Sequence, residues 1–396
     1  MSEWLLEKFK DHFAIGLRNG LTKPSRIRGS GVRMVNMKEI FGYDFIDDST
    51  PMELVPVTDK EFESSSLEQG DLLFARQSLT EAGAGKVAIY LGNAPTVFES
   101  HLIRCRINKQ KSDSRFLYYL FKSPIGKGAV STIVHQVAAA GIKSSDLQDL
   151  EFQTPQLSEQ KAIASVLSSL DDKIDLLHRQ NITLERMAET LFRLRFVEEA
   201  QEDWEEVKLG DFVEINKKSI NKAYPFNHIE YLDTGSLTEG KIENLQSYSI
   251  KEAPSRALRL VEHNDVLIST VRPNQKHYGI INNPIENLVV SSGFCVLTCT
   301  KISPHFVYLL LTNNEMTEFL HSIAEGSTST YPSLKPADIA AITFQLPPKE
   351  KLGDFAKIAN DAWGKIHQNY KQIQTLEKLR DNLLPKLMSG EVRINL

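Results

Sequence analysis

The sequence consists of one unit written twice. Residues of its two halves match in order at an offset of 192 to 200 positions, far longer than the period of a solenoid repeat. The matched pairs include Trp4 and Trp204, Asp71 and Asp265, Cys105 and Cys299, Lys143 and Lys335, Pro155 and Pro347, Ile174 and Ile366, and Leu184 and Leu376. A chain of this kind is expected to fold into two similar domains, each followed by the same type of segment.

Each half begins with a region of mixed α and β character. Four runs are rich in β-branched residues and are bounded by Gly, Asn or Pro, as strands usually are: 86–91, 97–107, 265–270 and 289–299. Two aromatic or leucine-rich runs, 115–122 and 304–311, favour a helix in each region. Pro155 and Pro347 end these regions, because proline commonly stands just before a new helix.

Apolar residues then recur every seven positions through residues 158–195. One seam position is occupied by Ile163, Leu170, Leu177, Leu184 and Leu191, and the other by Leu167, Ile174, Asn181 and Ala188. The second copy has Phe355, Ala362, Asn369, Leu376 and Leu383 at one position and Ala359, Ile366, Ile373 and Arg380 at the other. This spacing keeps one stripe of each helix facing a partner helix.

These patterns predict a mixed α/β fold with a pseudo-twofold internal repeat. Two similar α+β domains are combined with two long helices that form an antiparallel coiled coil. The predicted boundaries are 1–156 for the first domain, 157–198 for the first helix, 199–349 for the second domain and 350–396 for the second helix and tail.

The register of the two helices follows from their numbering. In an antiparallel pair, the numbers of facing residues have a constant sum, and a sum of 550 places apolar residues opposite apolar residues nearly throughout. The same sum places Asn181 opposite Asn369. Two facing asparagines can hydrogen-bond and so fix the alignment of the helices. The alternative is that each asparagine lies at a solvated edge.

The length of the helices suggests a purpose for this arrangement. A helix of roughly 30 residues is about 45–50 Å long. An antiparallel pair is then expected to place the two domains at opposite ends of a rod. That length corresponds to about 13–15 base pairs of B-DNA, so two reading domains on such a spacer would suit a split sequence with an unread gap.

Composition narrows the classes of protein. The formal net charge is −5, and residues 1–156, 157–200, 201–348 and 349–396 carry 0, −2, −6 and +3. No segment is a basic tail, so any affinity for nucleic acid must come from local patches or a partner. No apolar run approaches the ~18 residues of a membrane span. Three cysteines cannot form a disulfide framework in so long a chain, and the N-terminus is unlike a signal peptide, so we expect a cytoplasmic protein.

Three stretches resemble a known family. The run from Ile163 to Ile174 (IASVLSSLDDKI), followed by Thr183-Leu184-Glu185, resembles the central conserved region of the specificity (S) subunits of type I restriction–modification systems. The run from Leu383 to Val392 (LLPKLMSGEV) resembles the ending of that family, and Val207-Lys208-Leu209-Gly210-Asp211 resembles the start of its second target-recognition domain. The resemblance covers the whole chain in the same order of elements.

This resemblance implies a function and partners. Such a subunit performs no chemistry itself; it reads a bipartite sequence in double-stranded DNA, one half-site per target-recognition domain. Its helices hold two adenine methyltransferase (M) subunits, and restriction (R) subunits join them to cleave DNA. S-adenosylmethionine would belong to M and ATP to R, so no cofactor is expected on this chain. The alternative is a protein–protein scaffold whose paired domains bind no DNA.

The residues themselves also point away from catalysis. An adenine methyltransferase needs an Asn/Asp-Pro-Pro-aromatic loop, and Asn283-Pro284-Ile285-Glu286 fits a turn better. Gly83-Ala84-Gly85-Lys86 lacks the upstream glycine and the following Ser or Thr of a phosphate loop, which favours a glycine-rich hairpin. Cys295 and Cys299 have no partner pair with metal-binding spacing, so we expect no metal site.

The candidate DNA contacts are loops at equivalent places in the two halves. Arg can read guanine, Asn and Gln can read adenine, and Lys pairs with phosphate. The first-half candidates are Arg76, Gln77, Ser78, His135, Gln136 and Lys143, together with the basic run Lys23, Arg26, Arg28 and Arg33. The second-half candidates are Arg272, Asn274, Gln275, Lys276, His277, Ser327, Thr328, Ser329, Tyr331 and Lys335. For any one of these residues, the alternative is a solvated surface loop.

Overall fold

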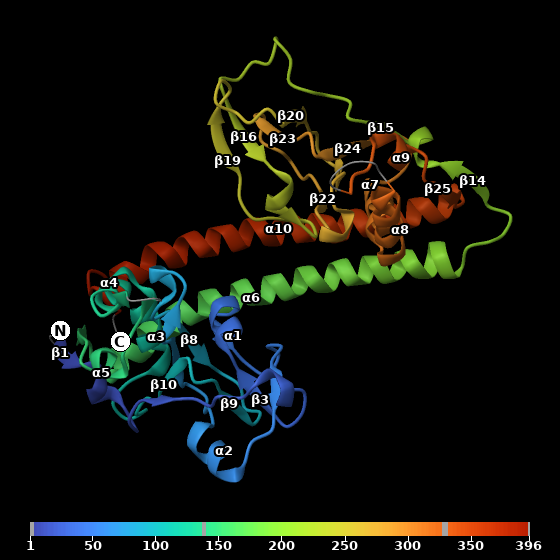
Figure 1. The fold of residues 1–396 in the computed structure, drawn as a ribbon. Helices are drawn as coiled ribbons and strands as arrows, with labels where there is room; N and C mark the ends of the chain where they lie inside the picture. Colours follow the sequence, from blue (N-terminus) through green and yellow to red (C-terminus); the bar gives the residue numbers. More distant parts are fainter. Residues whose placement is uncertain (1–3, 137–139, 327–331, 395–396) are drawn as a thin grey trace. The chain divides into compact units, whose positions relative to one another are not determined.

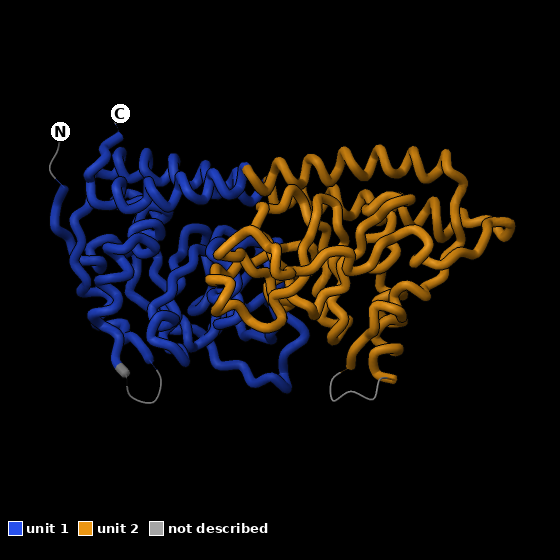
Figure 2. Tube along the Cα trace, turned by 90° about the horizontal axis from the view of Figure 1, so that it is seen from above, with its two compact units in different colours: residues 1–176, 372–396 blue, residues 177–371 orange. Residues whose placement is uncertain are grey.

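The computed structural model describes residues 4–136, 140–326 and 332–394. It divides into two compact units: unit 1 comprises residues 1–176 and 372–396, and unit 2 comprises residues 177–371 (Figure 2). Both long helices cross the boundary, so each unit holds one α+β domain and a part of each helix. The mixed α and β architecture and the internal repeat are as predicted.

The α+β domain of unit 1 contains two main sheets (Figure 1). The larger sheet has the strand order β2 (Arg18–Asn19), β10 (Leu102–Cys105), β6 (Leu72–Ala75), β8 (Val87–Tyr90) and β4 (Phe45–Ile46). The smaller sheet has the order β5 (Glu53–Val55), β3 (Val32–Val35) and β9 (Thr96–Phe98), and β3 and β9 run parallel. A separate pair joins β1 (Leu5–Lys8) to β13 (Glu151–Thr154). The helices of the domain are α1 (Met37–Gly42), α2 (Asp59–Ser65), α3 (Ser114–Lys122), α4 (Pro124–Ser131) and α5 (Ser144–Gln148).

Unit 2 repeats this plan. One sheet has the order β15 (Val213–Ile215), β24 (Phe294–Cys299), β21 (Val266–Ser269) and β22 (Tyr278–Ile280). The other has the order β19 (Gln246–Ser249), β16 (His228–Leu232), β23 (Leu288–Ser291) and β20 (Ala257–Leu260), with β16 and β23 parallel. Here β14 (Glu205–Lys208) pairs with β25 (Thr343–Leu346), and β17 (Leu237–Thr238) forms a hairpin with β18 (Lys241–Ile242). The helices are α7 (Pro304–Thr312), α8 (Asn314–Glu325) and α9 (Pro336–Ala340).

The repeat extends to individual turns. Gly70 and Asn264 both have a positive φ, of 99° and 71°, just before β6 and β21. The next residue in each copy is a buried aspartate, and its carboxylate accepts a hydrogen bond from the backbone N–H three residues before it: Asp71 from Glu68 and Asp265 from Glu262. The same turn therefore starts the same strand in both domains, which is expected of a duplicated unit.

The structure corrects two details of the sequence-based prediction. The runs 97–107 and 289–299 each form two strands, because the chain leaves the parallel pair (β9 or β23) and turns into the other sheet (β10 or β24). The pairing of the strands also corrects one residue match of the sequence alignment, that of Cys105 with Cys299. Cys105 lies opposite Leu72, whereas the residue opposite Val266 is Leu297, so Cys105 corresponds in structure to Leu297 and not to Cys299.

The two long helices are α6 (Leu157–Arg193), which a π-helical turn extends to Glu198, and α10 (Lys349–Met388). Within each unit the segments of α6 and α10 run antiparallel. This is seen from the contacts: residues with higher numbers on α6 contact residues with lower numbers on α10 or its tail. In unit 1, Asp171 pairs with Arg380, whereas Glu159 pairs with Arg393 in the tail that follows α10. In unit 2, Asn369 Nδ2 donates to Asn181 Oδ1 at 2.7 Å, and the rings of Phe192 and Phe355 are 6.1 Å apart. The asparagines are buried, with 3% of Asn181 and 0% of Asn369 exposed, so neither lies at a solvated edge.

Each domain is joined to the helix segments of its own unit by a different kind of contact. In unit 1, the hydroxyl of Tyr119 on α3 donates to Asp171 Oδ2 at 2.6 Å, and Arg380 Nη1 donates to Asp171 Oδ1 at 2.8 Å. Asp171 is only 8% exposed. We call these three residues the polar junction. Burial and the Asp171 carboxylate both raise the pKa of Tyr119, so its phenol stays protonated and donates.

In unit 2 the equivalent place is aromatic. Trp363 of α10 packs against His305 and Tyr308 of α7, with ring centroids 4.7 and 5.9 Å apart. The buried Ala188 of α6 belongs to the same hydrophobic core. We call these four residues the aromatic junction. Trp363 is 192 positions from Asp171, and Arg380 is 192 positions from Ala188. At equivalent positions of the repeat, unit 1 therefore has the Asp171 carboxylate where unit 2 has the Trp363 indole. Likewise, unit 1 has the Arg380 guanidinium where unit 2 has the Ala188 methyl group.

Candidate nucleic-acid interface

Two predicted loops of the first domain meet in one small sheet. β7 (Gln77–Ser78) pairs with β12 (Ala140–Gly141), and β12 pairs with β11 (His135–Gln136). The Ile142 N–H also donates to the Arg76 carbonyl at 2.9 Å. The segments 76–80, 135–136 and 140–143, which we call the first loop pair, therefore lie side by side although about 60 residues separate the first segment from the others in the sequence.

The second domain brings its loops together in the same way. Val271 forms a bridge with Ser333, the Arg272 N–H donates to the Pro332 carbonyl at 3.1 Å, and the Leu334 N–H donates to the Thr270 carbonyl at 2.7 Å. We call residues 270–277 and 332–335 the second loop pair. Ser327, Thr328, Ser329 and Tyr331, which were also predicted to contact DNA, lie outside the described residues.

The tip of the second loop pair is a short 3-10 turn over Pro273–Gln275. Arg272 and Lys276, on either side of it, have left-handed backbones with φ of 49° and 56°. Pro273 is buried, whereas Asn274 and Gln275 are exposed. Pro273 thus anchors the turn in the domain, and the side chains of Asn274 and Gln275 are exposed to solvent.

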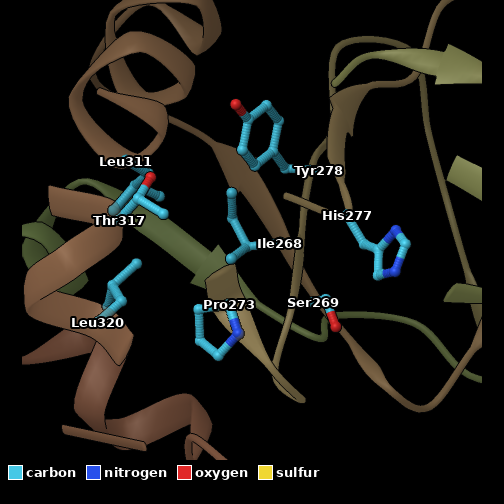
Figure 3. Close-up of a pocket in the computed structure, with 8 residues that line it drawn as sticks. All are labelled: Ile268, Ser269, Pro273, His277, Tyr278, Leu311, Thr317 and Leu320. Carbon is cyan, nitrogen blue, oxygen red and sulfur yellow. The ribbon is translucent and has the colours of Figure 1, made fainter. Parts of the chain in front are cut away.

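A small pocket lies under this turn (Figure 3). Pro273 and Ile268 lie toward Thr317 and Leu320 of α8, and the remaining lining residues are Ser269, His277, Tyr278 and Leu311. Its volume of about 10 Å³ is enough for about one water molecule. The pocket is therefore too small for a base or a cofactor. It lies where the turn packs against α8.

Two predicted contacts of the second loop pair are held by neighbouring groups. Lys276 Nζ forms an ion pair with Glu239 Oε1 at 3.0 Å, and His277 Nδ1 is 2.8 Å from the Leu237 carbonyl oxygen. Glu239 in turn repels Glu185 and Glu189 of α6. Burial, with added repulsion from Glu189 and Glu239, raises the pKa of Glu185 to about 7. Lys276 therefore faces an acidic group of its own unit.

The basic run of the first domain is largely paired within the domain. Lys23 Nζ is 2.8 Å from Glu61 Oε1, and its hydrogen bond lowers the pKa of Glu61 to about 2. Arg28 pairs with Glu53 and also donates to the Lys23 carbonyl. Arg33 donates to the Thr50 carbonyl at 2.7 Å, with Asp48 3.6 Å away. Arg26 is exposed on a 3-10 turn (Ser25–Ile27). Only a part of this run is thus presented to a ligand.

The remaining predicted residues lie at helix starts and strand ends. His135 Nε2 is 2.9 Å from Asp146 Oδ2, and this hydrogen bond lowers the pKa of Asp146. Gln136 pairs through its backbone with Ala140. Lys143 and Lys335 are exposed and stand at the N-caps of α5 and α9, so the repeat places one lysine at the same position of each loop pair.

One exposed residue of the first loop pair was missed by the sequence analysis. Leu79 follows β7 directly and is 99% exposed. Polar residues surround it in the sequence (Gln77-Ser78-Leu79-Thr80), so no periodic pattern singles it out. The loop pairs are thus the places where both domains gather exposed groups suited to a nucleic acid.

The described part of the chain contains no candidate metal centre. Cys105 and Cys295 are buried on strands, and burial raises the pKa of both thiols. Over those residues, His, Cys, Asp and Glu form no group of three able to hold a metal ion. Their helices include none that is both long and apolar enough to span a membrane.

Comparison with known proteins identifies related chains. The model of the type I restriction modification DNA specificity domain matches this chain twice, over residues 32–186 and 201–380. The chain is 26% identical to the type I restriction enzyme MjaIX specificity subunit of Methanocaldococcus jannaschii, over 99% of this chain and 94% of that protein. It is 29% identical to the HindI specificity subunit of Haemophilus influenzae over 46% of this chain and 40% of that protein.

A solved structure supports the fold. The S subunit of a type I restriction–modification system from M. genitalium aligns over 97% of this chain and 96% of its own length with a TM-score of 0.61. The sequence identity is 17%, so this likeness concerns the fold alone.

Proposed function

The chain belongs to the type I restriction modification DNA specificity family, and from this premise we propose that it reads a split sequence in double-stranded DNA with one loop pair per half-site. It is a specificity subunit with two DNA-specificity domains, a role without catalysis. Methyl transfer and cleavage belong to partner subunits of such a system. One observation carries the proposal. The two domains share the same backbone arrangement around their loop pairs, which we call the shared frame, but the loops themselves carry different side chains.

The shared frame places the loop pair at the same position in each domain. In both domains the strand after the Asp71 or Asp265 turn leads directly into a loop pair, and a lysine at a helix start follows it. The tips differ, with Gln77 and Leu79 in the first pair and Asn274 and Gln275 in the second. Different side chains on one frame suit two half-sites of different sequence.

We assign the DNA contacts to the two loop pairs. Side chains that donate and accept hydrogen bonds read base edges, and cations pair with phosphates. The assigned residues are Arg76, Gln77, Ser78, His135, Gln136 and Lys143 in the first domain, and Arg272, Asn274, Gln275, Lys276, His277 and Lys335 in the second. Arg26 is the member of the basic run best placed to add a phosphate contact, since it is exposed while Lys23, Arg28 and Arg33 are paired.

We further propose that the outer faces of the helices hold two methyltransferase subunits, which restriction subunits then join. Apolar side chains recur on these faces at the offset of the repeat. Val166 and Ile358 are 37% and 38% exposed, and Met187 and Leu379 are 56% and 45% exposed. Equivalent exposed residues on the two helices suit two copies of one partner, because the internal repeat provides the same kind of surface twice.

Methylome sequencing of a host with and without this gene and its methyltransferase partner tests the proposal. We expect adenine methylation at one split motif with an unread gap, present only with the gene. A continuous motif, or methylation that does not depend on the gene, would contradict it.

Loop variants then assign the half-sites. Asn274→Ala with Gln275→Ala is expected to relax only one half of the motif, and Arg76→Ala with Gln77→Ala only the other, at about 1–3 kcal/mol for each lost bidentate contact. The matched control is Lys109→Ala, a surface lysine outside both loop pairs. A mobility shift against randomised DNA, with and without methyltransferase subunits, tests the alternative of a scaffold that binds no DNA.

A further inference from the structure

Leu79 is far more exposed than any comparable residue. It is 99% exposed, whereas the next most exposed large hydrophobic side chain among the described residues, Leu6, is 65% exposed. Burying a leucine side chain stabilises a complex by about 1.5–3 kcal/mol. A leucine held fully in water at the end of a strand of the first loop pair is therefore available to an apolar group of a ligand.

The loop that carries Leu79 is braced on both sides. Before it, Gln77 and Ser78 pair with Gly141 and Ala140 of β12. After it, the Thr80 N–H donates to Ser78 Oγ at 3.1 Å, and the Gly83 N–H donates to the Thr80 carbonyl at 3.1 Å. A fixed loop loses little conformational entropy when its tip meets a ligand.

Gly83 shows how closely this loop is folded. A Cβ atom on Gly83 would lie 2.2 Å from Ser78 Oγ and 3.0 Å from the ring of Phe41, so only glycine fits there. Lys86 Nζ closes the far end by donating to the Phe41 carbonyl at 2.9 Å. The backbone is thus folded under Leu79, and its side chain is left pointing into solvent.

The groups around Leu79 are polar. Gln77 is exposed two residues before it, and Lys143 is exposed just after Ile142, which is hydrogen-bonded to Arg76. One apolar side chain within hydrogen-bonding groups complements the edge of a base pair in the major groove. On that edge, thymine carries the only apolar group, its C5 methyl.

We propose that Leu79 contacts the C5 methyl of a thymine in the half-site read by the first domain, and so makes thymine a requirement at that position. The inference rests on the proposed function, since it supplies one base contact of the same site. The second domain differs: its tip presents Asn274 and Gln275, and its own apolar residue, Pro273, is buried. Among the described residues of the second loop pair, no apolar side chain is exposed as Leu79 is, so we assign the apolar contact to the first half-site.

Replacement of thymine by uracil removes only this methyl group and tests the proposal. The full chain is assembled with its methyltransferase partner, and Kd is measured by fluorescence anisotropy on duplexes of the mapped motif with each thymidine in turn replaced by deoxyuridine. We expect one replacement in the first half-site to weaken wild-type binding about three- to tenfold, the effect of one buried methyl group and its contacts. The Leu79→Ala variant is expected to lose less than about twofold at the same position.

The control is Leu54→Ala, which truncates a leucine on β5 that is 37% exposed and should leave the uracil effect intact. An equal uracil effect in Leu79→Ala, no uracil effect in wild type, or a first half-site without thymine on either strand would overturn the inference. Wild-type protein that binds no split motif would instead overturn the proposed function, so the two failures are distinguishable.

Discussion

In unit 1 the domain is joined to the helices by a buried carboxylate, whereas in unit 2 the equivalent place is filled by rings. Asp171 accepts hydrogen bonds from Tyr119 and Arg380, and Trp363 packs on His305 and Tyr308. A buried ion pair stabilises little relative to well-packed apolar groups, but it is costly to break. The comparison teaches that a repeat can preserve a backbone position while its two copies exchange one kind of interaction for another.

Breaking the polar junction has the largest expected effect. Arg380→Ala leaves the Asp171 carboxylate buried with only the Tyr119 hydroxyl, which should cost about 3–5 kcal/mol of unfolding free energy. Urea unfolding followed by circular dichroism measures this cost. The double variant Asp171→Ala with Arg380→Ala should be less destabilised than Arg380→Ala alone, because it leaves no unpaired charge. A cost below about 1 kcal/mol for Arg380→Ala would show that the junction is weak.

Converting one junction toward the other sharpens the comparison. Trp363→Asp removes the ring contacts with His305 and Tyr308 and places a carboxylate there, at an expected cost of about 3 kcal/mol. Adding Ala188→Arg, at the position that the repeat relates to Arg380, should recover about 1–3 kcal/mol. Unfolding of unit 2 followed by fluorescence of Trp204 measures both variants. If the double variant is no more stable than Trp363→Asp alone, the two junctions are not equivalent in geometry.

At the asparagine pair, unlike at the two junctions, both long helices contribute the same residue type. Asn369→Leu removes the donor to Asn181 and leaves a buried amide oxygen without it, at a cost of about 1–3 kcal/mol. We propose that this pair fixes the register of the helices. The double variant Asn181→Leu with Asn369→Leu is therefore expected to be nearly as stable as wild type by urea unfolding. Equal losses in the single and double variants would contradict this role.

The pH dependence of unit 2 gives the smallest net effect, because two groups oppose each other. Burial lowers the pKa of His305 to about 4 from 6.5, so its contribution to stability is full above pH 6.5 and is lost as the pH falls toward 4. Glu185 has the opposite sign. Its raised pKa of about 7 makes its contribution full below pH 4.5 and lost as the pH rises toward 7.

Single variants separate these two contributions. Between pH 7 and pH 5, Glu185→Gln is expected to lose about 1–2 kcal/mol of stability, because Glu185 no longer offsets the His305 effect. His305→Gln is expected to gain a similar amount over the same range, while wild type changes little. Thermal unfolding at the two pH values measures all three. Slopes of the same sign in both variants would refute the assignment.

Much of the fold followed from local patterns. The duplication, the strand that follows Asp265 and the heptads can all be seen in the sequence, because strand and helix periodicities are short-range. The constant sum of 550 places Asn181 opposite Asn369, and the structure has these two amides hydrogen-bonded. A register can be calculated in this way because both helices are long and their apolar residues recur every seven positions.

The candidate site was harder to foresee. The basic run was visible, but its partners Glu61, Glu53 and Asp48 come from other elements, so the sequence could not show that Lys23, Arg28 and Arg33 are paired. β7 and β12 have only two residues each, and such short strands leave no alternating pattern to read. Their pairing, which brings the first loop pair together, depends on the tertiary fold.

The three segments that meet at Asp171 restrict how a protein of this design can acquire a new target. Tyr119 comes from the first domain, Asp171 from the first long helix and Arg380 from the second. A gene exchange that replaced residues 1–156 alone would bring in α3 of another protein, and that helix would have to pack against the Asp171 carboxylate of this chain. A donor without a hydroxyl at that place would assemble poorly, whatever bases its loops read. We therefore expect such an exchange to tolerate only donors that keep a hydroxyl at the position of Tyr119, a residue that lies outside both loop pairs.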